Sequence, residues 1–433
     1  MENSKDRIQS IIEKGMKAGA SAVKVRTNGE NRNACHFKNG SLKNIDSADK
    51  SYIHVSVIKD GKLGTGLVTS LNDIEDGLAR AFDMARVGKQ MYFSAYPAAG
   101  TYPGVKLSSD DVEALTTDYL IEESSRFCDA MASINKNFST DCSSFVHIWN
   151  NISAFSNGVY KEMKETAWVL QGGIQLSEDG DLQQTWDFRG SRRAGKDVNY
   201  DLIIDAVKTS YEYGRTIAAT ASGNLPVIFD PDSVNSLGWI LNLGVNGKQV
   251  AEKASPLCDK LGTKILADNI TIVDDPHVDY DLSAAVMDND GIPTRKMTVV
   301  DKGVLKAFAY DLNTAAKEGV EPTGHSGSSL TSSRLLGGKK PWKELLKEID
   351  RGIYVENMLG FGQGNLINGD FNANVGRGFL IEKGEIKGRV KNTMISGNLY
   401  ELAKRNVLIS SDIHPQYRQP WLVLDGVSVS SKG

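Results

Sequence analysis

Residues 225–248 read LPVIFDPDSVNSLGWILNLGVNGK, and this stretch predicts a short buried strand that leads directly into a helix. Asp230 followed by Pro231 is a strong signal for a helix start, because an aspartate caps the first turn and proline lacks only an N–H that has no partner there. Junctions of this kind often carry catalytic groups. After Asp232, however, the predicted helix has no ionisable side chain before Lys248. Whether it belongs to an active site therefore depends on the rest of the chain.

The predicted helix is apolar around much of its circumference. A core stripe at helical spacing is widened by Trp239 and Ile240. A helix of this kind is normally buried, either within its own domain or against a partner chain, and the sequence leaves both possibilities open. The stripe consists of Val234, Leu237, Leu241 and Val245.

Composition places the chain among soluble globular proteins. Its 433 residues exceed one ordinary core, so two domains are expected. With 24% charged residues and a net charge of −4, the chain has no electrostatic footprint for direct binding of nucleic acid. The densest basic cluster, RGSRRAGK at 189–196, is interpreted as a solvated loop; it contains Arg189, Arg192, Arg193 and Lys196.

Targeting and cysteine signals indicate a cytoplasmic protein. The first ten residues, MENSKDRIQS, contain no apolar core of a signal peptide, and no run approaches the 18 apolar residues of a membrane span. We therefore expect no membrane association. Four cysteines lie far apart without C-x-x-C spacing, which favours free and mostly buried thiols in a reducing compartment; they are Cys35, Cys128, Cys142 and Cys258.

The order of predicted elements indicates an α+β fold. Residues 1–220 are expected to form an N-terminal α+β domain, an antiparallel sheet with helices on one side, with a possible sub-boundary in the Pro/Gly-rich connector at 92–106. Residues 221–433 are expected to form a larger strand-rich domain. Asn39-Gly40 and Asp60-Gly61 predict tight hairpin turns. The periodicity further predicts helices over 110–135, 199–215, 231–244, 311–318 and 341–350.

No catalytic motif is evident. The six histidines lie at least 18 residues apart, so none has the spacing that places two imidazoles on one helix face. His325 stands out because its loop, EPTGHSGSSL, is rich in Gly and Ser. Asp288 and Asp290, in DNDGIP, are candidates for acid–base or cation-binding roles, but the favoured interpretation is that they bond backbone donors in a turn. GFGQGN at 360–365 lacks dinucleotide-loop spacing and is interpreted as a turn.

The sequence resembles the TldD/PmbA family, also described as modulators of DNA gyrase. The segment DNDGIPTRKMTVVDKGVLKAFAYDLNTAAKEG, at 288–319, is similar to the family's acidic-Gly-x-Pro-Thr signature before a hairpin and a helix. Further similarities are GASAVKVR, KNGSLKNID and GKLGTGLVTS near the N-terminus, LPVIFDP, and the region from Arg351 to Ile386. No single motif is specific, but their order over some 400 residues is, and the resemblance spans nearly the whole chain.

The resemblance implies a member without its own metal. TldD-type chains carry H-E-x-x-x-H on the helix after VIFDP and a cysteine near the C-terminus, which hold zinc. TldE/PmbA-type chains lack the motif and pair with a TldD-type chain. By distance from Asp230-Pro231, the motif would lie at about Trp239, Ile240 and Gly244, and the last cysteine is Cys258. We therefore expect no catalytic or metal-binding residue and no cofactor in this chain, with zinc in its partner.

Three functions remain in competition. The favoured one is a TldE/PmbA-like subunit that pairs with a TldD-like zinc peptidase, binds peptide and forms a homodimer when purified alone. The second is a non-enzymatic regulator of a protein partner such as DNA gyrase. The third is a stand-alone hydrolase with an unrecognised site. Whether the chain is itself an enzyme stays open, and the candidate substrate or partner surface comprises Trp239, Asp288, Asp290 and His325.

Overall fold

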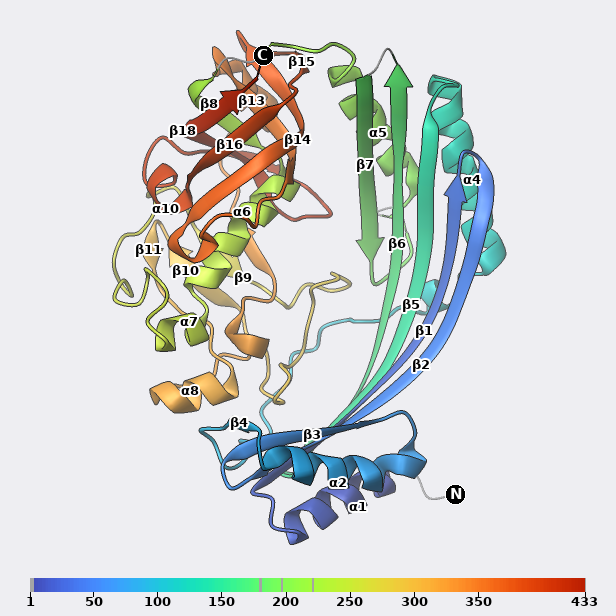
Figure 1. Ribbon diagram of the computed structural model, residues 1–433, viewed down its shortest axis with the longest axis vertical. Helices are drawn as coiled ribbons and strands as arrows, with labels where there is room; N and C mark the ends of the chain where they lie inside the picture. Colours follow the sequence, from blue (N-terminus) through green and yellow to red (C-terminus); the bar gives the residue numbers. More distant parts are fainter. Residues whose placement is uncertain (1–3, 179–180, 196–197, 220–221, 433) are drawn as a thin grey trace.

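The computed structural model describes residues 4–178, 181–195, 198–219 and 222–432. A long, curved sheet formed by the N-terminal part faces a strand-rich C-terminal part (Figure 1). This arrangement confirms the predicted α+β class, with an antiparallel N-terminal sheet and a strand-rich C-terminal region. In the part of the chain so described, no helix combines the length and apolar character needed to cross a lipid bilayer.

The first sheet has seven antiparallel strands in the order β4-β3-β2-β1-β5-β6-β7. Asn39 and Asp60 have positive φ angles of 52° and 50°, and each precedes a glycine with positive φ, which confirms the two predicted hairpin turns. The strands are β1 (Ala22–Lys38), β2 (Ser41–Lys59), β3 (Lys62–Val68), β4 (Lys89–Gln90), β5 (Ser139–Phe155), β6 (Tyr160–Glu178) and β7 (Asp181–Ser191).

Helices cover one face of this sheet, as predicted. Val23 and Val25 of β1 pack against α1 and α2, while Cys35 and Phe37 of the same strand pack with α4 and α5. Odd-numbered residues of one strand share a face, so all four helices lie on the same side. The helices are α1 (Ser4–Lys17), α2 (Ile74–Ala85), α3 (Asp110–Glu113), α4 (Thr117–Ile134) and α5 (Tyr200–Tyr213), with a 3₁₀ turn η1 (Leu71–Asp73).

The prediction of one continuous helix over 110–135 is wrong. Thr116 has extended backbone angles and its side chain caps α4 by accepting a hydrogen bond from the Tyr119 N–H, at 3.2 Å. A threonine in this role begins a new helix, so α3 and α4 are separate.

The C-terminal part is built around a sheet that closes on itself. Five strands form a ring in the order β13-β8-β18-β16-β14, because β14 also pairs with β13. β15 and β17 add to its rim, and a smaller sheet has the order β11-β10-β9-β12. The strands are β8 (Gly223–Phe229), β9 (Ile272–Asp274), β10 (Met297–Asp301), β11 (Val304–Leu305), β12 (Ser333–Leu335), β13 (Arg351–Leu359), β14 (Asp370–Glu382), β15 (Glu385–Arg389), β16 (Thr393–Asn398), β17 (Leu408–Ile413) and β18 (Pro420–Ser431).

The largest core of the protein lies between this ring and helix α6. Val234, Leu237, Leu241 and Val245 of the predicted stripe are all buried there. The helix is therefore buried largely within its own chain. The C-terminal helices are α6 (Pro231–Gly244), α7 (Gly247–Ala251), α8 (Leu312–Glu318), α9 (Trp342–Lys347) and α10 (Leu399–Leu402), with 3₁₀ turns η2 (Ser326–Ser328) and η3 (Leu366–Asn368).

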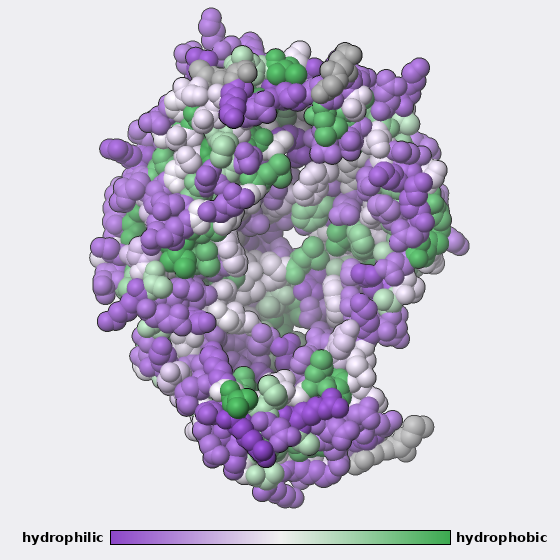
Figure 2. All heavy atoms as spheres, in the orientation of Figure 1, coloured by the Kyte–Doolittle hydropathy of each residue, from purple (hydrophilic) through white to green (hydrophobic). Residues whose placement is uncertain are grey.

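The two parts touch at several separated places and leave a hollow between them. Lys24 of β1 forms an ion pair with Asp290, and Ser210 of α5 donates a hydrogen bond to Glu356 of β13. Between such contacts the molecule is visibly hollowed, and both apolar and polar side chains surround the opening (Figure 2). The concave, helix-free face of the first sheet points toward this space (Figure 1).

Candidate functional site

The start of α6 has the capped geometry that its sequence predicts. The Asp230 carboxylate accepts a hydrogen bond from the Ser233 N–H at 2.8 Å, and Pro231 occupies the first helical position. The backbone N–H of Asp230 bonds the carbonyl of Val355 at 3.0 Å, which fastens the helix start to β13. Asp232, in the first turn of α6, lines two cavities between the two parts of the chain.

The middle of α6 has no donor set for a metal ion. Trp239 is 50% exposed, Ile240 is fully buried, and the Tyr400 hydroxyl occupies the place where a Cβ atom on Gly244 would lie. Within the described residues, no three His, Cys, Asp or Glu side chains are grouped so that they could hold a metal ion. The residues present at this helix therefore do not fit the zinc site of TldD-type chains.

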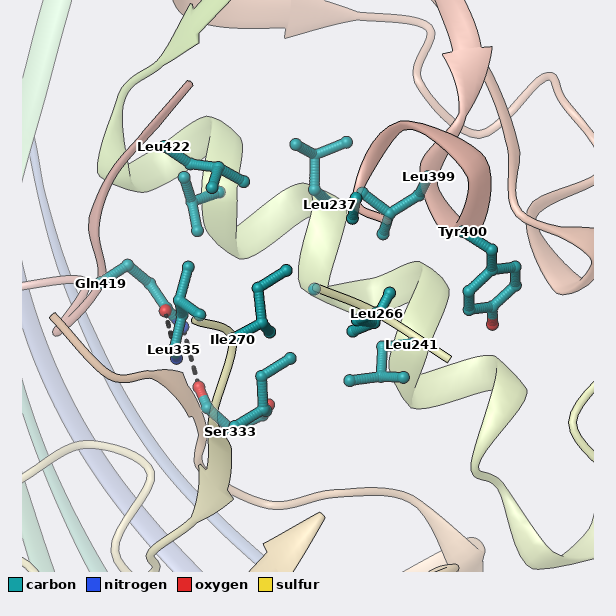
Figure 3. A pocket seen from close by; sticks show the side chains of 14 residues that line it. Leu237, Leu241, Leu266, Ile270, Ser333, Leu335, Leu399, Tyr400, Gln419 and Leu422 are labelled. Atoms are coloured by element: carbon teal, nitrogen blue, oxygen red, sulfur yellow. Dashed lines mark hydrogen bonds between the residues drawn. The ribbon is translucent and has the colours of Figure 1, made fainter. Parts of the chain in front are cut away.

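The inner side of α6 lines an apolar cavity of about 60 Å³. Leu237 and Leu241 of the helix point toward Leu266, Ile270 and Leu399 from other segments (Figure 3). Polar groups in the wall are already paired: Gln419 donates to the Ser333 carbonyl at 2.8 Å and accepts from the Leu335 N–H at 3.0 Å. A small cavity with apolar walls and satisfied polar groups is a packing defect rather than a site for chemistry.

His325 lies in the protein interior. Its side chain is 1% exposed, and its Nε2 and Nδ1 atoms lie 3.1 Å from Asp274 Oδ2 and 2.8 Å from Thr323 Oγ1. Asp274 is fully buried and its other oxygen accepts from the Ser332 N–H at 2.7 Å. Both ring nitrogens thus have partners, and this arrangement connects the 323–325 loop to β9.

Asp288 and Asp290 lie in a turn that contacts the first sheet. Asp288 Oδ1 accepts hydrogen bonds from the N–H groups of Asp290 and Ile292 at 2.8 and 2.9 Å, and burial raises the pKa of Asp288 to about 6. Asp290 pairs with Lys24 at 2.9 Å. The Asn289 N–H bonds Ser326 Oγ, so this turn lies beside the 323–328 loop, but the His325 ring points away into the core. The structure thus brings the two acids together and leaves His325 and Trp239 apart from them.

A different group of residues meets where β7 approaches the start of α6. Two cavities, of about 310 and 760 Å³, lie there and share Asp232 and Tyr417 in their walls. We call their combined space the cleft. Its walls include β7 and α5 of the N-terminal part, and α6, α9, β13, β14, the 414–419 loop and the start of β18 in the C-terminal part. The volume of each of the two cavities is in the range of ligand-binding pockets.

Two buried ion pairs stand in the smaller cavity of the cleft. Arg377 Nε lies 2.6 Å from Glu356 Oε2, which also accepts from the Ser210 hydroxyl at 2.6 Å. On β7, Arg189 pairs with Asp187. Burial is costly for a charge, so such pairs persist only where each charge has a partner.

Burial shifts several pKa values in the cleft. Desolvation raises the pKa of Asp187 to about 6. It also raises the pKa of Asp232, although the positive charge of Arg377 partly offsets this effect. It lowers the pKa of His414 to about 3, assisted by Arg189, so this imidazole is neutral near pH 7. Its Nδ1 accepts from the Gln416 N–H at 3.2 Å, which leaves the proton on Nε2. Clustered shifts in a cleft are typical of functional sites.

The prediction that the basic cluster at 189–196 is a solvated loop is wrong for two of its residues. Arg189 and Arg192 are each 6% exposed. Arg189 belongs to β7, and Arg192 pairs with Glu165 and donates to the carbonyls of Asp281 and Leu282. The spacing of Asp187 and Arg189, two residues apart and hence on one face of a strand, was a signal for a buried pair. Lys196 lies outside the described residues.

Comparisons with known proteins match most of the chain. The family model described as PmbA/TldA metallopeptidase C-terminal domain matches residues 222–431, and that described as PmbA/TldA metallopeptidase domain 1 matches residues 25–87. The protein named Metalloprotease PmbA from Escherichia coli O157:H7 is 26% identical over 386 residues, covering 86% of this chain and 84% of that protein.

Solved structures share the fold over nearly the whole length. A Thermotoga maritima protein described as a modulator of a DNA gyrase superimposes with a TM-score of 0.90 at 24% identity, covering 99% of this chain and all of the other. TldE from Thermococcus kodakarensis superimposes with a TM-score of 0.88 at 22% identity, covering 98% and 100%. At sequence identities of 24% and 22%, the structural similarity to these two proteins establishes the fold.

Proposed function

Because the chain belongs to the PmbA/TldD family, we propose that it is the TldE/PmbA-type subunit of a TldD/TldE-type metallopeptidase system. In this role it carries no catalytic metal, pairs in the cytoplasm with a TldD-like zinc peptidase chain and helps to bind and process peptides. Zinc belongs to the partner. Membership of the family supports a role in a peptidase system, and the residues of α6 support a non-catalytic role for this chain.

The observation that carries the proposal is the structure of α6 at positions 239, 240 and 244. Tryptophan, isoleucine and glycine provide neither an imidazole ligand nor a carboxylate base. Tyr400 also fills the space beside Gly244, so the surrounding core is adapted to the lack of a side chain there. Ile240 and Gly244 are thus packed in an apolar core, while Trp239 is half exposed.

The hollow between the two parts supports a role in binding peptide. Among the strands of the described residues, β7 pairs with β6 alone and forms the edge of the first sheet. Its outward N–H groups at Phe188 and Gly190 are bonded to the side chains of Asp187 and Gln416, at 2.8 and 2.6 Å. The segment 182–186 precedes these bonds, and an extended peptide can add to such an edge through backbone hydrogen bonds. Trp239, half-exposed on α6, is a candidate contact for the partner chain.

Co-purification tests the proposal. The full chain, tagged and expressed in its native host, is expected to bring down a chain with H-E-x-x-x-H in near-equal amount. The pair should cleave peptides in a chelator-sensitive manner, and the isolated chain should not. Recovery of the chain as a homodimer alone, even when the TldD-like chain is present, would contradict the proposal. Recovery with DNA gyrase and without peptide cleavage would instead establish the regulator suggested by the names of structural neighbours.

A further inference from the structure

Aromatic rings form a continuous wall along the cleft. Trp342 stacks on both Tyr354 and Trp421, with ring centroids 5.5 Å apart in each case. Trp421 contacts His414 at 6.3 Å, and His414 contacts Tyr417 at 5.0 Å. These five rings all line the smaller cavity. We call them the aromatic wall; the series continues to β7 through Phe188 and Trp186.

The same cavity has more acidic than basic groups. Its two guanidinium groups, of Arg189 and Arg377, are already paired with Asp187 and Glu356. His414 is neutral near pH 7 because its pKa is lowered. Three further carboxyl groups in the wall form no ion pair within the described residues, although Arg377 attracts the Asp232 carboxylate from a distance; they belong to Asp205, Asp230 and Asp232.

Asp232 is the carboxylate best placed for a ligand. Asp205 is exposed on α5, and Asp230 is engaged as the cap of α6. The Asp232 side chain forms no hydrogen bond or ion pair within the described part of the chain, and it borders both cavities of the cleft. It also complements the positive end of the helix dipole, but that role requires no aromatic surroundings.

An unpartnered hydroxyl provides an independent sign of a ligand. Thr185 of β7 is 2% exposed and lines the smaller cavity, and its Oγ1 has no hydrogen-bond partner among the described residues. Buried hydroxyl groups normally have a partner, and leaving one without costs about 1–3 kcal/mol. A ligand in the cavity that carries N–H groups would supply it.

We propose that the smaller cavity of the cleft binds the positively charged group of a peptide, held by Asp232 and the aromatic wall. The cation is an N-terminal ammonium or a Lys or Arg side chain, since both present N–H donors and a charge to the same surroundings. Aromatic faces attract cations through their quadrupole, and a carboxylate in a partly dry site attracts them further. The peptide nature of the ligand rests on the proposed function; the preference for a cation rests on the cavity alone.

The test uses the full chain and matched peptides. Binding is followed by tryptophan fluorescence, with Ac-Ala-Ala-Lys-Ala-NH₂ compared with the same peptide bearing norleucine for lysine. A third peptide, with norleucine and a free N-terminus, separates the two sources of the cation. We expect at least one cationic peptide to bind about tenfold more tightly than the neutral one, and the tighter of the two identifies the source.

Variants locate the preference in the cavity. Asp232→Asn should abolish most of the preference for cationic over neutral peptides, and Trp342→Leu should reduce this preference severalfold. Trp342→Phe should restore part of the preference because an aromatic face returns. Asp49→Asn, at an exposed carboxylate on β2, is the matched control and should bind as the wild type does. Unfolding curves verify that each variant is folded. Equal binding of charged and neutral peptides, no binding of either, or an unchanged preference in Asp232→Asn would overturn the inference.

Failure of this inference is distinguishable from failure of the proposed function. A chain that pairs with a TldD-like peptidase but shows no preference for cations would retain the function and lose the cation site. A chain that prefers cationic peptides but never pairs or supports cleavage would retain the site and lose the function.

Discussion

The hydroxyl group of Tyr400 occupies the space that any side chain on Gly244 would need. The same hydroxyl donates a hydrogen bond to the Ile240 carbonyl at 3.3 Å. One residue of α10 thereby packs against two positions of α6, Ile240 and Gly244. Tyr400 is itself buried, and burial raises its pKa, so the phenol stays protonated as the donor. The absence of a side chain at position 244 is therefore part of how this core is built.

Substituting Gly244 by alanine should destabilise the protein. The added methyl group meets Tyr400, so Gly244→Ala is expected to lower the free energy of unfolding by about 1–3 kcal/mol, measured by urea denaturation. Gly238→Ala, in the same helix but with open space beside it, is the control and should be neutral or stabilising by up to about 1 kcal/mol. Equal effects of the two substitutions would contradict this account.

The buried carboxyl of Asp288 should make stability depend on pH. Its folded pKa, about 6, lies above the ordinary value because of burial and the neighbouring Asp290. Between about pH 4 and 6 the unfolded chain has lost this proton and the folded chain keeps it, so stability falls as pH rises through this window, by up to about 3 kcal/mol. Asp288→Asn keeps an oxygen acceptor for the N–H groups of Asp290 and Ile292 and should remove this component. Parallel pH profiles of unfolding free energy for the two proteins would refute the assignment.

Breaking the Glu356–Arg377 ion pair should lower the free energy of unfolding more than removing the Ser210 hydroxyl group that also bonds Glu356. Glu356→Gln removes the ion-pair partner of the buried Arg377 and is expected to reduce the unfolding free energy by about 3–5 kcal/mol. Ser210→Ala removes only the 2.6 Å hydrogen bond from α5 and should cost about 1–2 kcal/mol. Thermal or urea unfolding distinguishes the two; a larger effect for Ser210→Ala would show that the pair is not the main connection.

Replacing Trp239 should weaken pairing but hardly change stability, whereas replacing His325 should lower stability without a direct effect on pairing. Trp239→Ser changes a half-exposed side chain, so the unfolding free energy should shift by less than about 1 kcal/mol, while recovery of the TldD-like partner should fall. His325→Phe removes the bond to buried Asp274 and should cost about 2–4 kcal/mol without a direct effect on pairing. Full peptide cleavage by a pair that contains Trp239→Ser would remove Trp239 from the partner surface.

Local signals in the sequence predicted local structure well. Asn39-Gly40, Asp60-Gly61 and the Asp230-Pro231 helix start each depend on backbone geometry within four residues, and all three are confirmed. The break at Thr116 was missed because the apolar periodicity continues across it. The buried charges of Arg189 and Arg192 were missed because a basic cluster is usually solvated; Asp187, two residues before Arg189, was a local signal, whereas the partner of Arg192, Glu165, lies on another strand.

The sequence by itself determined the α+β class and the family, because these follow from short-range patterns and from the order of motifs along the chain. Only the tertiary structure decided which side chains meet in the cleft. Asp232, Thr185 and Trp342 lie on three different elements and are brought around one cavity by strand pairing and by the approach of β7 to the C-terminal part. No local sequence pattern predicts that these three residues lie around one cavity, because their arrangement depends on contacts between residues far apart in the chain.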